Sequence, residues 1–180
     1  MIELNFIPFP ILSTERLILR QVRLEDKNEI FALRSDDRVN QFLDRPKAET
    51  VEDARQHIQR LNEGMIRHES IIWAITLKES DKLIGSICFW KISKEFSKAE
   101  IGYELLPEYQ GKGIMQEVMP LVIEYGYEKI KFHCIEAELS PGNLKSIKLL
   151  EKNGFARKVN DEKDQGVSDS VVYTLINSKT

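Results

Sequence analysis

The stretch Leu105–Met115 holds the residues whose types and spacing are best suited to chemistry. It reads Leu-Leu-Pro-Glu-Tyr-Gln-Gly-Lys-Gly-Ile-Met and lies between a predicted strand and a predicted helix. Backbone amides in such a turn and at a helix N-terminus lack partners, so with the helix dipole they form an anion site that suits a pyrophosphate. Gly111 and Gly113 allow the backbone to approach phosphates closely. The alternative is that the two glycines only shape a turn.

Two common phosphate-binding signatures are excluded. A P-loop requires G-x-x-x-x-G-K-[ST], which the chain does not contain. A dinucleotide fingerprint requires G-x-G-x-x-G, but Gln116 stands at the third glycine position, and several predicted strands precede the turn instead of one. We therefore expect a phosphorylated cofactor held in a different fold.

Two carboxylates share one face of the strand that precedes this turn. Glu100 and Glu104 are four residues apart with Gly102 between them, so all three point to the same side of a strand. If that face borders a cleft, either carboxylate can accept a proton, directly or through water. The alternative is that both are solvent-facing or ion-paired. A base needs a pKa raised by burial, which a sequence does not show.

Hydrophobic periodicity predicts the elements that position these residues. Strands are expected at about 16–21, 71–77, 83–90, 98–106, 132–139, 155–159 and 171–176, and helices at 24–37, 49–67, 112–129 and 143–153. The order β-α-α-β-β-β-α-β-α-β-β predicts one α/β domain, with a mixed, mostly antiparallel sheet flanked by about four helices. The parallel pair should lie around the helix at 112–129.

Several local features refine this outline. Thr50 is a plausible helix N-cap and Gly154 a helix C-cap, whereas Pro120 should kink its helix or lengthen a hydrogen bond. Segments 38–46 and 161–169 are expected to be a loop and a polar turn. Because Pro8 and Pro10 interrupt the start of the chain, we expect residues 1–11 to be an irregular leader and residues 12–177 to be the domain.

Composition excludes several classes of function. The net charge of the 180 residues is −3, so there is no basic surplus of the kind that binds nucleic acid. Two cysteines 46 residues apart make neither a disulfide framework nor a zinc knuckle, and they favour a reducing compartment. The longest apolar runs are about six residues, far short of a membrane span. Without a basic start typical of a signal peptide, the expected location is cytoplasmic.

The cysteine, tryptophan and histidine residues are interpreted as structural rather than catalytic or metal-binding. Cys134 is predicted to be buried core rather than a nucleophile. Trp73 and Trp90 are predicted to be core aromatics, with the alternative that one of them lines an acceptor pocket. No metal site is expected, because the three histidines lack ligand-like spacing: His57, His68 and His133.

Several motifs, in order, resemble the GNAT superfamily of N-acetyltransferases, and more narrowly its bacterial ribosomal-protein N-terminal (Rim-type) branch. Gln110–Met115 is similar to the Q/R-x-x-G-x-G/A cofactor loop, with Met115 in place of the small last residue. The similarity covers about residues 12–177. Its other carriers are Thr14–Arg20, Ala99–Leu105, the acidic Glu117, and the N-x-x-S…L-E-K-x-G-F ending at Asn143–Ser146 and Leu150–Phe155.

The resemblance implies acetyl-CoA as acyl donor and an amine as acceptor. It also implies a splayed gap between the strands at 98–105 and 132–139, where the pantetheine arm lies like an extra strand. Leu105 would bond the arm or the acetyl group through its backbone, and Asn143 would bind the arm. The pyrophosphate would be held through the backbone of Gln110, Gly111, Lys112, Gly113, Ile114 and Met115.

The resemblance also ranks the catalytic candidates. Glu100 matches the place of a base glutamate, and Glu104 is the second candidate. Many members carry an acid tyrosine a few residues after the asparagine. Here that stretch has no tyrosine, so Ser146 is the candidate acid and a further contact of coenzyme A. A free α-amine, with a pKa near ~8, needs less help from a base than a lysine, with a pKa near ~10.4.

The acceptor is left open between a protein N-terminus and a small amine such as an antibiotic, polyamine or amino acid. The acceptor loops should be segments 24–70 and 161–169, and acidic residues near 49–53 would tolerate a cationic acceptor. A second class of function is a catalytically silent acyl-CoA-binding regulatory module. No nucleic acid or membrane partner is expected, and an exposed strand edge within 155–176 makes a homodimer possible.

Overall fold

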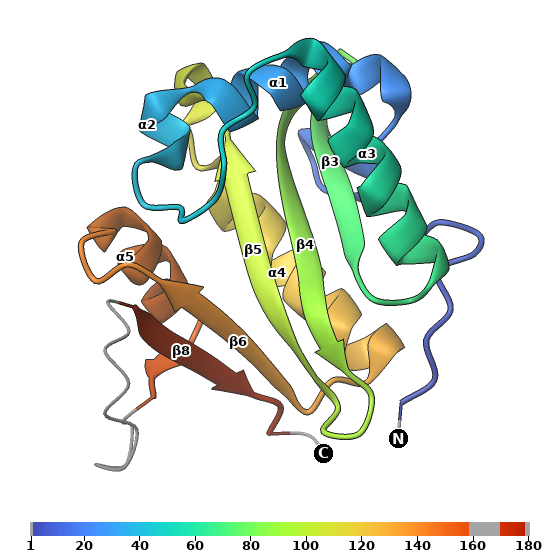
Figure 1. Ribbon diagram of the computed structural model, residues 1–180. Coiled ribbons are helices and arrows are strands. Elements are labelled where there is room, and N and C mark those ends of the chain that lie inside the picture. The colour runs from blue at the N-terminus through green and yellow to red at the C-terminus, as the bar shows by residue number, and fades with distance from the viewer. Residues whose placement is uncertain (1, 159–169, 179–180) are drawn as a thin grey trace.

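The computed structural model describes residues 2–158 and 170–178, which form one mixed sheet with helices on both faces (Figure 1). The strands are β1 (Leu12–Ser13), β2 (Leu17–Gln21), β3 (Ile71–Leu77), β4 (Leu83–Ser93), β5 (Lys98–Leu105), β6 (Cys134–Leu139), β7 (Ala156–Arg157) and β8 (Val171–Ile176). The α-helices are α1 (Lys27–Ser35), α2 (Asp37–Asn40), α3 (Val51–Ile66), α4 (Ile114–Tyr125) and α5 (Leu144–Lys152). Short 3₁₀ or π turns cover Leu24–Asp26, Pro107–Tyr109 and Gly126–Ile130.

The sheet has the order β1-β2-β3-β4-β5-β6-β8-β7. Within the described residues every neighbouring pair is antiparallel except β5 and β6, which are joined by a crossover through α4. A parallel pair requires such a crossover connection, and the helix predicted at 112–129 supplies it. The predicted α/β class with a mostly antiparallel sheet is therefore confirmed.

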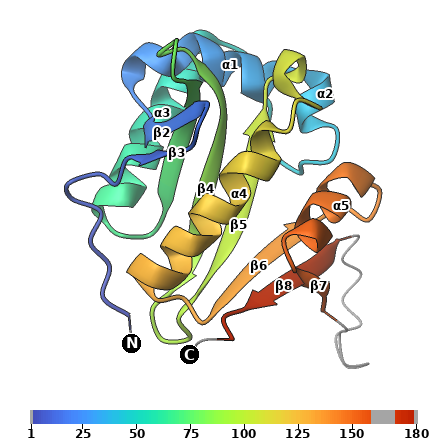
Figure 2. The ribbon, with the colours of Figure 1, turned by 180° about the vertical axis from the view of Figure 1, so that it is seen from behind.

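Helices cover the two faces of the sheet separately. Figure 2 shows α4 lying across β4 and β5 on the face opposite to α1 and α3. Val118, Met119 and Val122 of α4 are fully buried, because the 3–4 spacing of the apolar residues gives this helix one apolar face. On the other face Leu33 of α1 and Ile58 of α3 are likewise fully buried.

The structure confirms several local predictions for strand bounds and helix ends. Strands β3 and β8 match their predicted bounds, and the Thr50 hydroxyl accepts a hydrogen bond from the backbone N–H of Asp53 at 3.2 Å as the N-cap of α3. Gly154 has φ +85° and directly follows the cap residue Asn153 of α5. Helix α4 continues through Pro120, whose side chain is exposed, and ends in the π turn.

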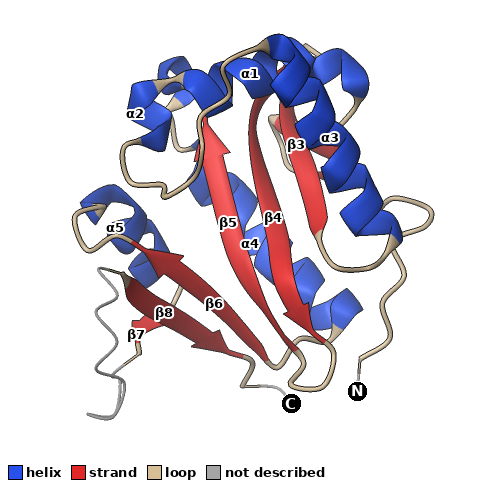
Figure 3. Ribbon diagram, in the orientation of Figure 1, coloured by secondary structure: helices blue, strands red, loops and turns tan. Residues whose placement is uncertain are grey.

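Other boundaries differ from the prediction (Figure 3). The predicted loop 38–46 begins within helix α2, because the Asp36 carboxylate accepts from the backbone N–H of Arg38 at 2.8 Å and caps a new helix. The first predicted helix therefore becomes a 3₁₀ turn followed by α1, and the helix count rises to five within the described residues. The predicted turn 161–169 lies outside the described residues.

Residues 2–11 contain no helix or strand, as expected for a leader, yet they pack onto the domain. Leu4 and Phe6 are buried in the main core. The indole N–H of Trp73 donates to the backbone oxygen of Pro10 at 2.8 Å. The division of the chain at residue 12 stays a prediction, and so does the homodimer through the edge near β7.

Gly85→Ala is expected to lower the free energy of unfolding by about 2 kcal/mol, since overpacking against backbone typically costs ~1–3 kcal/mol. A Cβ at Gly85 of β4 would collide with the backbone oxygen of Glu104 on β5. Gly142→Ala is the control, because its Cβ would lie 3.5 Å from Phe42 Cε1 in ordinary contact. Urea denaturation measures both variants, and equal losses of stability would contradict the tight β4–β5 approach.

Candidate active site

Strands β5 and β6 pair over a short length and then separate. Their register joins Lys98, Ala99 and Glu100 to Cys134, Ile135 and Glu136, after which no further pair forms between the two strands. Figure 1 shows them side by side at one end and diverging toward the other. Each strand keeps its other neighbour, β4 or β8, along its full course, so the sheet opens at this position rather than fraying.

The backbone of Leu105 faces the opening between β5 and β6. The backbone N–H of Leu106 donates to Ile84 on β4 at 2.9 Å, so by strand alternation the amide and carbonyl of Leu105 point the opposite way. The side-chain amide of Gln110 donates to the Leu105 carbonyl at 3.1 Å. The Leu105 amide therefore remains as a donor to a ligand that lies along β5.

The glycine-rich turn leaves the backbone amides at the start of α4 free to bind an anion. Gly111 has φ +73° and Gly113 has φ +75°, a left-handed conformation that favours glycine. Gly113 is the N-cap of α4, and among the described residues no side chain caps this helix. The amides of its first turn, from Ile114 onward, are left to a ligand, as in known phosphate sites at helix N-termini.

Two residues between β1 and β2 hold this turn in place. The Thr14 hydroxyl donates to one oxygen of Glu117 on α4, and Arg16 Nε donates to the other at 2.7 Å. The Arg16 guanidinium also reaches the Lys112 carbonyl at 3.4 Å. Burial works to raise the pKa of Glu117, but these hydrogen bonds outweigh it and hold the pKa below its usual range. Glu117 is thus a structural tie for the turn.

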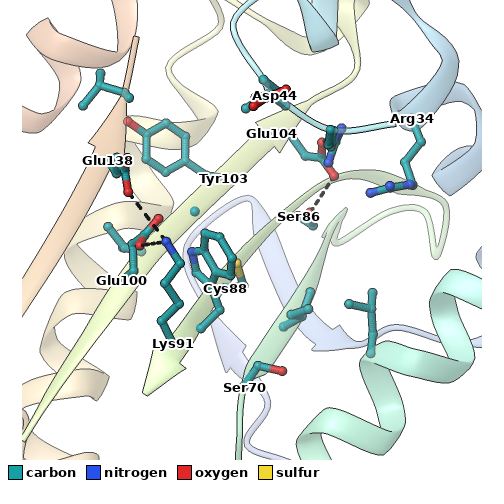
Figure 4. Close-up of a pocket in the computed structure, with 18 of the residues that line it drawn as sticks. Arg34, Asp44, Ser70, Ser86, Cys88, Lys91, Glu100, Tyr103, Glu104 and Glu138 are labelled. Atoms are coloured by element: carbon teal, nitrogen blue, oxygen red, sulfur yellow. Dashed lines mark hydrogen bonds and ion pairs between the residues drawn. The ribbon is translucent and has the colours of Figure 1, made fainter. Parts of the chain in front are cut away.

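The other predicted cofactor contacts lie at the start of α5. The Asn143 side-chain oxygen accepts from the Ser146 N–H at 3.2 Å, so it caps α5 and leaves the amide group of Asn143 for a ligand. The Tyr103 ring extends from β5 toward β6 (Figure 4). Burial raises the pKa of Tyr103 to about 12, although a hydrogen bond with the Ser146 hydroxyl opposes that rise. A neutral phenol therefore lies beside the candidate acid.

A cavity of about 770 Å³ adjoins the opening on the face covered by α1 and α3. We call it the sheet-face cavity. It is lined by residues of α1, the loop before α3, α3 itself, β4, β5 and β6. Its size falls within the ~300–1,000 Å³ of ordinary ligand pockets. The segment 24–70, predicted to form acceptor loops, supplies one of its walls.

Glu100 lies at one end of the sheet-face cavity within an ion cluster. Lys91 Nζ lies 2.8 Å from a Glu100 oxygen and 3.6 Å from a Glu138 oxygen (Figure 4). Only 13% of the Glu100 side chain is exposed. Burial raises the pKa of Glu100, and Lys91 opposes that rise without cancelling it. A carboxylate with a raised pKa beside a cleft is suited to act as a base.

Glu104 lies on the same face but is held differently. Arg45 Nη2 lies 2.5 Å from one of its oxygens, and the Ser86 hydroxyl donates to the other at 3.3 Å. The guanidinium and the hydroxyl thus occupy both oxygens of Glu104, so neither is left for the proton of an amine. Between the two predicted carboxylates, the surroundings favour Glu100 as the base.

The tryptophans and cysteines differ from the prediction in part. Trp73 is fully buried, but Trp90 is 41% exposed and lines the cavity, so the assignment of Trp90 to the core is wrong. That it contacts an acceptor stays a prediction. A Cβ at Gly102 would lie 3.2 Å from Cys88 Sγ, which also lines the cavity. Burial raises the pKa of Cys88 to about 12, so its thiol stays neutral. Cys134 is only partly buried, a correction to its core assignment.

Several residues of the site carried no readable signal in the sequence. Lys91 and Arg45 reach the carboxylates only because a β-bulge and a loop bring them there. The alternation along β5 groups Tyr103 with core residues, yet its ring reaches the opening between β5 and β6. Among the described residues there is no cluster of three or more potential metal ligands, and no helix is long and apolar enough to cross a membrane.

Known proteins are similar to this chain in sequence or in fold. Residues 16–156 match the family model described as an acetyltransferase (GNAT) domain. The uncharacterized N-acetyltransferase YoaA of Bacillus subtilis (strain 168) is 36% identical over 150 residues, which cover 83% of this chain and 85% of that protein.

Two solved structures superpose on the chain closely. RimL, a ribosomal L7/L12 alpha-N-protein acetyltransferase in complex with coenzyme A, has a TM-score of 0.78 at 20% identity, covering 93% of this chain and 98% of that one. The microcin C7 self-immunity acetyltransferase MccE, in complex with acetyl-CoA and AMP, has a TM-score of 0.77 at 23% identity, covering 91% and 94%. At these identities the two structures bear on the fold alone.

Lys91→Met is expected to move the acidic limb of the pH dependence of kcat/KM to higher pH. Lys91 holds down the pKa of Glu100, so its removal lets that pKa rise further, and the base becomes ionised only at higher pH. Lys94→Met, in the turn that follows β4 and outside the cavity lining, is the control. An acidic limb that stays in place in Lys91→Met would show that Glu100 is not the titrating group.

Proposed function

The chain belongs to the GNAT family and is an N-acetyltransferase, and on that premise we propose that it transfers acetyl from acetyl-CoA to a protein N-terminal α-amine by direct attack. The observation that supports acetyl-CoA as the acyl donor is the limited β5–β6 pairing. It leaves backbone hydrogen-bond donors along an opening between the two strands. An arm lying there would approach Glu100 from one side of the sheet, and the sheet-face cavity lets an amine approach from the other.

The residues of the cofactor loop fit acetyl-CoA through their backbone. The left-handed Gly111 and Gly113 and the uncapped first turn of α4, within Gln110–Met115, would hold the pyrophosphate. The amide of Leu105 would bond the arm or the acetyl group, and the side-chain amide of Asn143 would bond the arm from the α5 side. Most of this recognition uses backbone amides, which agrees with a chain that has no basic surplus.

The proton transfers are assigned to Glu100 and Ser146. Glu100, with its raised pKa, takes the proton of the attacking amine directly or through water. Ser146, which lies beside the neutral Tyr103, donates to the departing thiolate. Glu104 is the second candidate base, but its ion pair with Arg45 disfavours that role.

A protein N-terminus suits this base better than a lysine does. A free α-amine has a pKa near ~8, so a carboxylate opposed by Lys91 is a sufficient base, whereas a lysine at ~10.4 needs a stronger one. RimL is named as acting on a protein α-amine. The competing acceptor is a small-molecule amine, which the same cavity has room to hold.

Glu100→Gln is expected to lower kcat/KM by about 100-fold, the usual scale for a lost general base, and Ser146→Ala by about tenfold. The measurement is thiol release from acetyl-CoA with N-terminal peptides, lysine peptides, polyamines and amino acids as acceptors. Glu136→Gln is the matched control, because Glu136 pairs with Glu100 in the β5–β6 register but does not line the cavity.

Coenzyme A binding, measured by calorimetry, separates loss of catalysis from loss of the donor. Tight binding with thiol release only on small amines would overturn the N-terminal acceptor. Full activity of Glu100→Gln on N-terminal peptides would overturn the assignment of the base.

A further inference from the structure

The sheet-face cavity carries opposite charges at its two ends. Glu100 and Glu138 lie at one end, with Lys91 as their cationic partner. Arg34 and Arg45 lie at the other end, where Arg45 is already paired with Glu104. Figure 4 shows the Glu100 end and the Arg34 end on opposite sides of the cavity.

Arg34 is the cation of this cavity that lacks a carboxylate partner within the described residues. Its guanidinium contacts two neutral groups, His57 Nε2 and the Pro46 carbonyl, each at 3.4 Å. Asp44, an acidic lining residue on the loop before α3, is exposed to solvent and forms no ion pair with Arg34. Burial lowers the pKa of Arg34 and the charge of Arg45 adds to that effect, while the charge of Glu104, which is paired with Arg45, opposes it. A guanidinium remains protonated at neutral pH.

The pKa of the neighbouring His57 is lowered by burial and by the positive charge at this end of the cavity. Burial, together with the charges of Arg34, Arg60 and Arg45, lowers the pKa of His57 to about 3. The imidazole is therefore neutral and adds no competing charge. Half-buried guanidinium groups without a carboxylate of their own are suited to bind an anionic group of a ligand, because charge-assisted hydrogen bonds are strongest where water is partly excluded.

The two ends are separated by the length of a short peptide. Glu100 and Glu104 are four residues apart on β5, a distance of roughly 13 Å at ~3.3 Å per residue. Glu104 marks the arginine end through its contact with Arg45. An extended acceptor whose amine lies at Glu100 advances roughly 10 Å by its fourth residue, at ~3.3 Å per residue. A glutamate side chain at that residue spans the remaining few ångströms to the arginine end.

We infer that the acceptor is a polypeptide N-terminus with an acidic side chain at its fourth residue, bound by Arg34 across the sheet-face cavity from Glu100. This inference rests on the proposed N-acetyltransferase function and specifies its substrate class. The carboxylate of the acceptor supplies the partner that Arg34 lacks, and the amine meets the acidic end. A cationic or neutral side chain at the same position gains no such contact.

The test compares pentapeptides that begin with serine, consist otherwise of alanine, and carry one glutamate or one glutamine at position 2 or position 4. We expect kcat/KM to be about tenfold higher for glutamate than for glutamine at position 4, and nearly equal for the two at position 2. Arg34→Met should reduce the position-4 ratio toward one, and Arg34→Lys should retain part of it.

Arg55→Met on α3 is the matched control, since Arg55 pairs with Glu52 outside the cavity and the ratio should stay at the wild-type value. Wild-type enzyme that acetylates all four peptides equally would overturn this inference and leave the proposed function intact, and so would a preference for glutamate at position 2 alone. Release of thiol with no peptide, but with small amines, would overturn both. The wild-type comparison decides the matter even if an Arg34 variant fails to fold.

Discussion

The parallel pairing of β5 and β6 extends over three residues on each strand, and the site depends on that limit. Beyond Glu100 the two strands separate while each keeps its antiparallel neighbour. Backbone groups on the inner edges of separated strands need partners, and a ligand lying between the strands can supply them. The same divergence brings the first turn of α4, the start of α5 and the face of Glu100 around one opening.

The two faces of the sheet present different kinds of polar group. On the α4 face the donors are mostly backbone amides, arranged by the glycine-rich turn and by the tie of Glu117 to Thr14 and Arg16. On the other face the sheet-face cavity is lined by apolar side chains together with ionised ones, which are acidic near Glu100 and basic near Arg34. A cavity without charges would admit many amines. A cavity with an acidic and a basic end favours an acceptor that has an amine at one end and an anionic group at the other.

The sequence predicted what depends on local pattern. A β-branched and aromatic run predicted the bounds of β3, a capping residue marked the start of α3, and two glycines, which are left-handed in the structure, marked the turn. Features that depend on tertiary contact were beyond it. Lys91 reaches Glu100 through a bulge, and Arg45 reaches Glu104 across 59 residues of chain. The same limit explains why Trp90 was placed in the core: alternation shows which residues share a face, not what covers it.

The most direct measurement is a crystal structure of the protein grown with coenzyme A. The account predicts the pantetheine arm between β5 and β6, its pyrophosphate on the amides around Gly111 and Gly113, and its sulfur beside Ser146 with Glu100 within reach of an acceptor. An arm bound outside the β5–β6 opening, or a sulfur far from the Glu100 end of the sheet-face cavity, would contradict it.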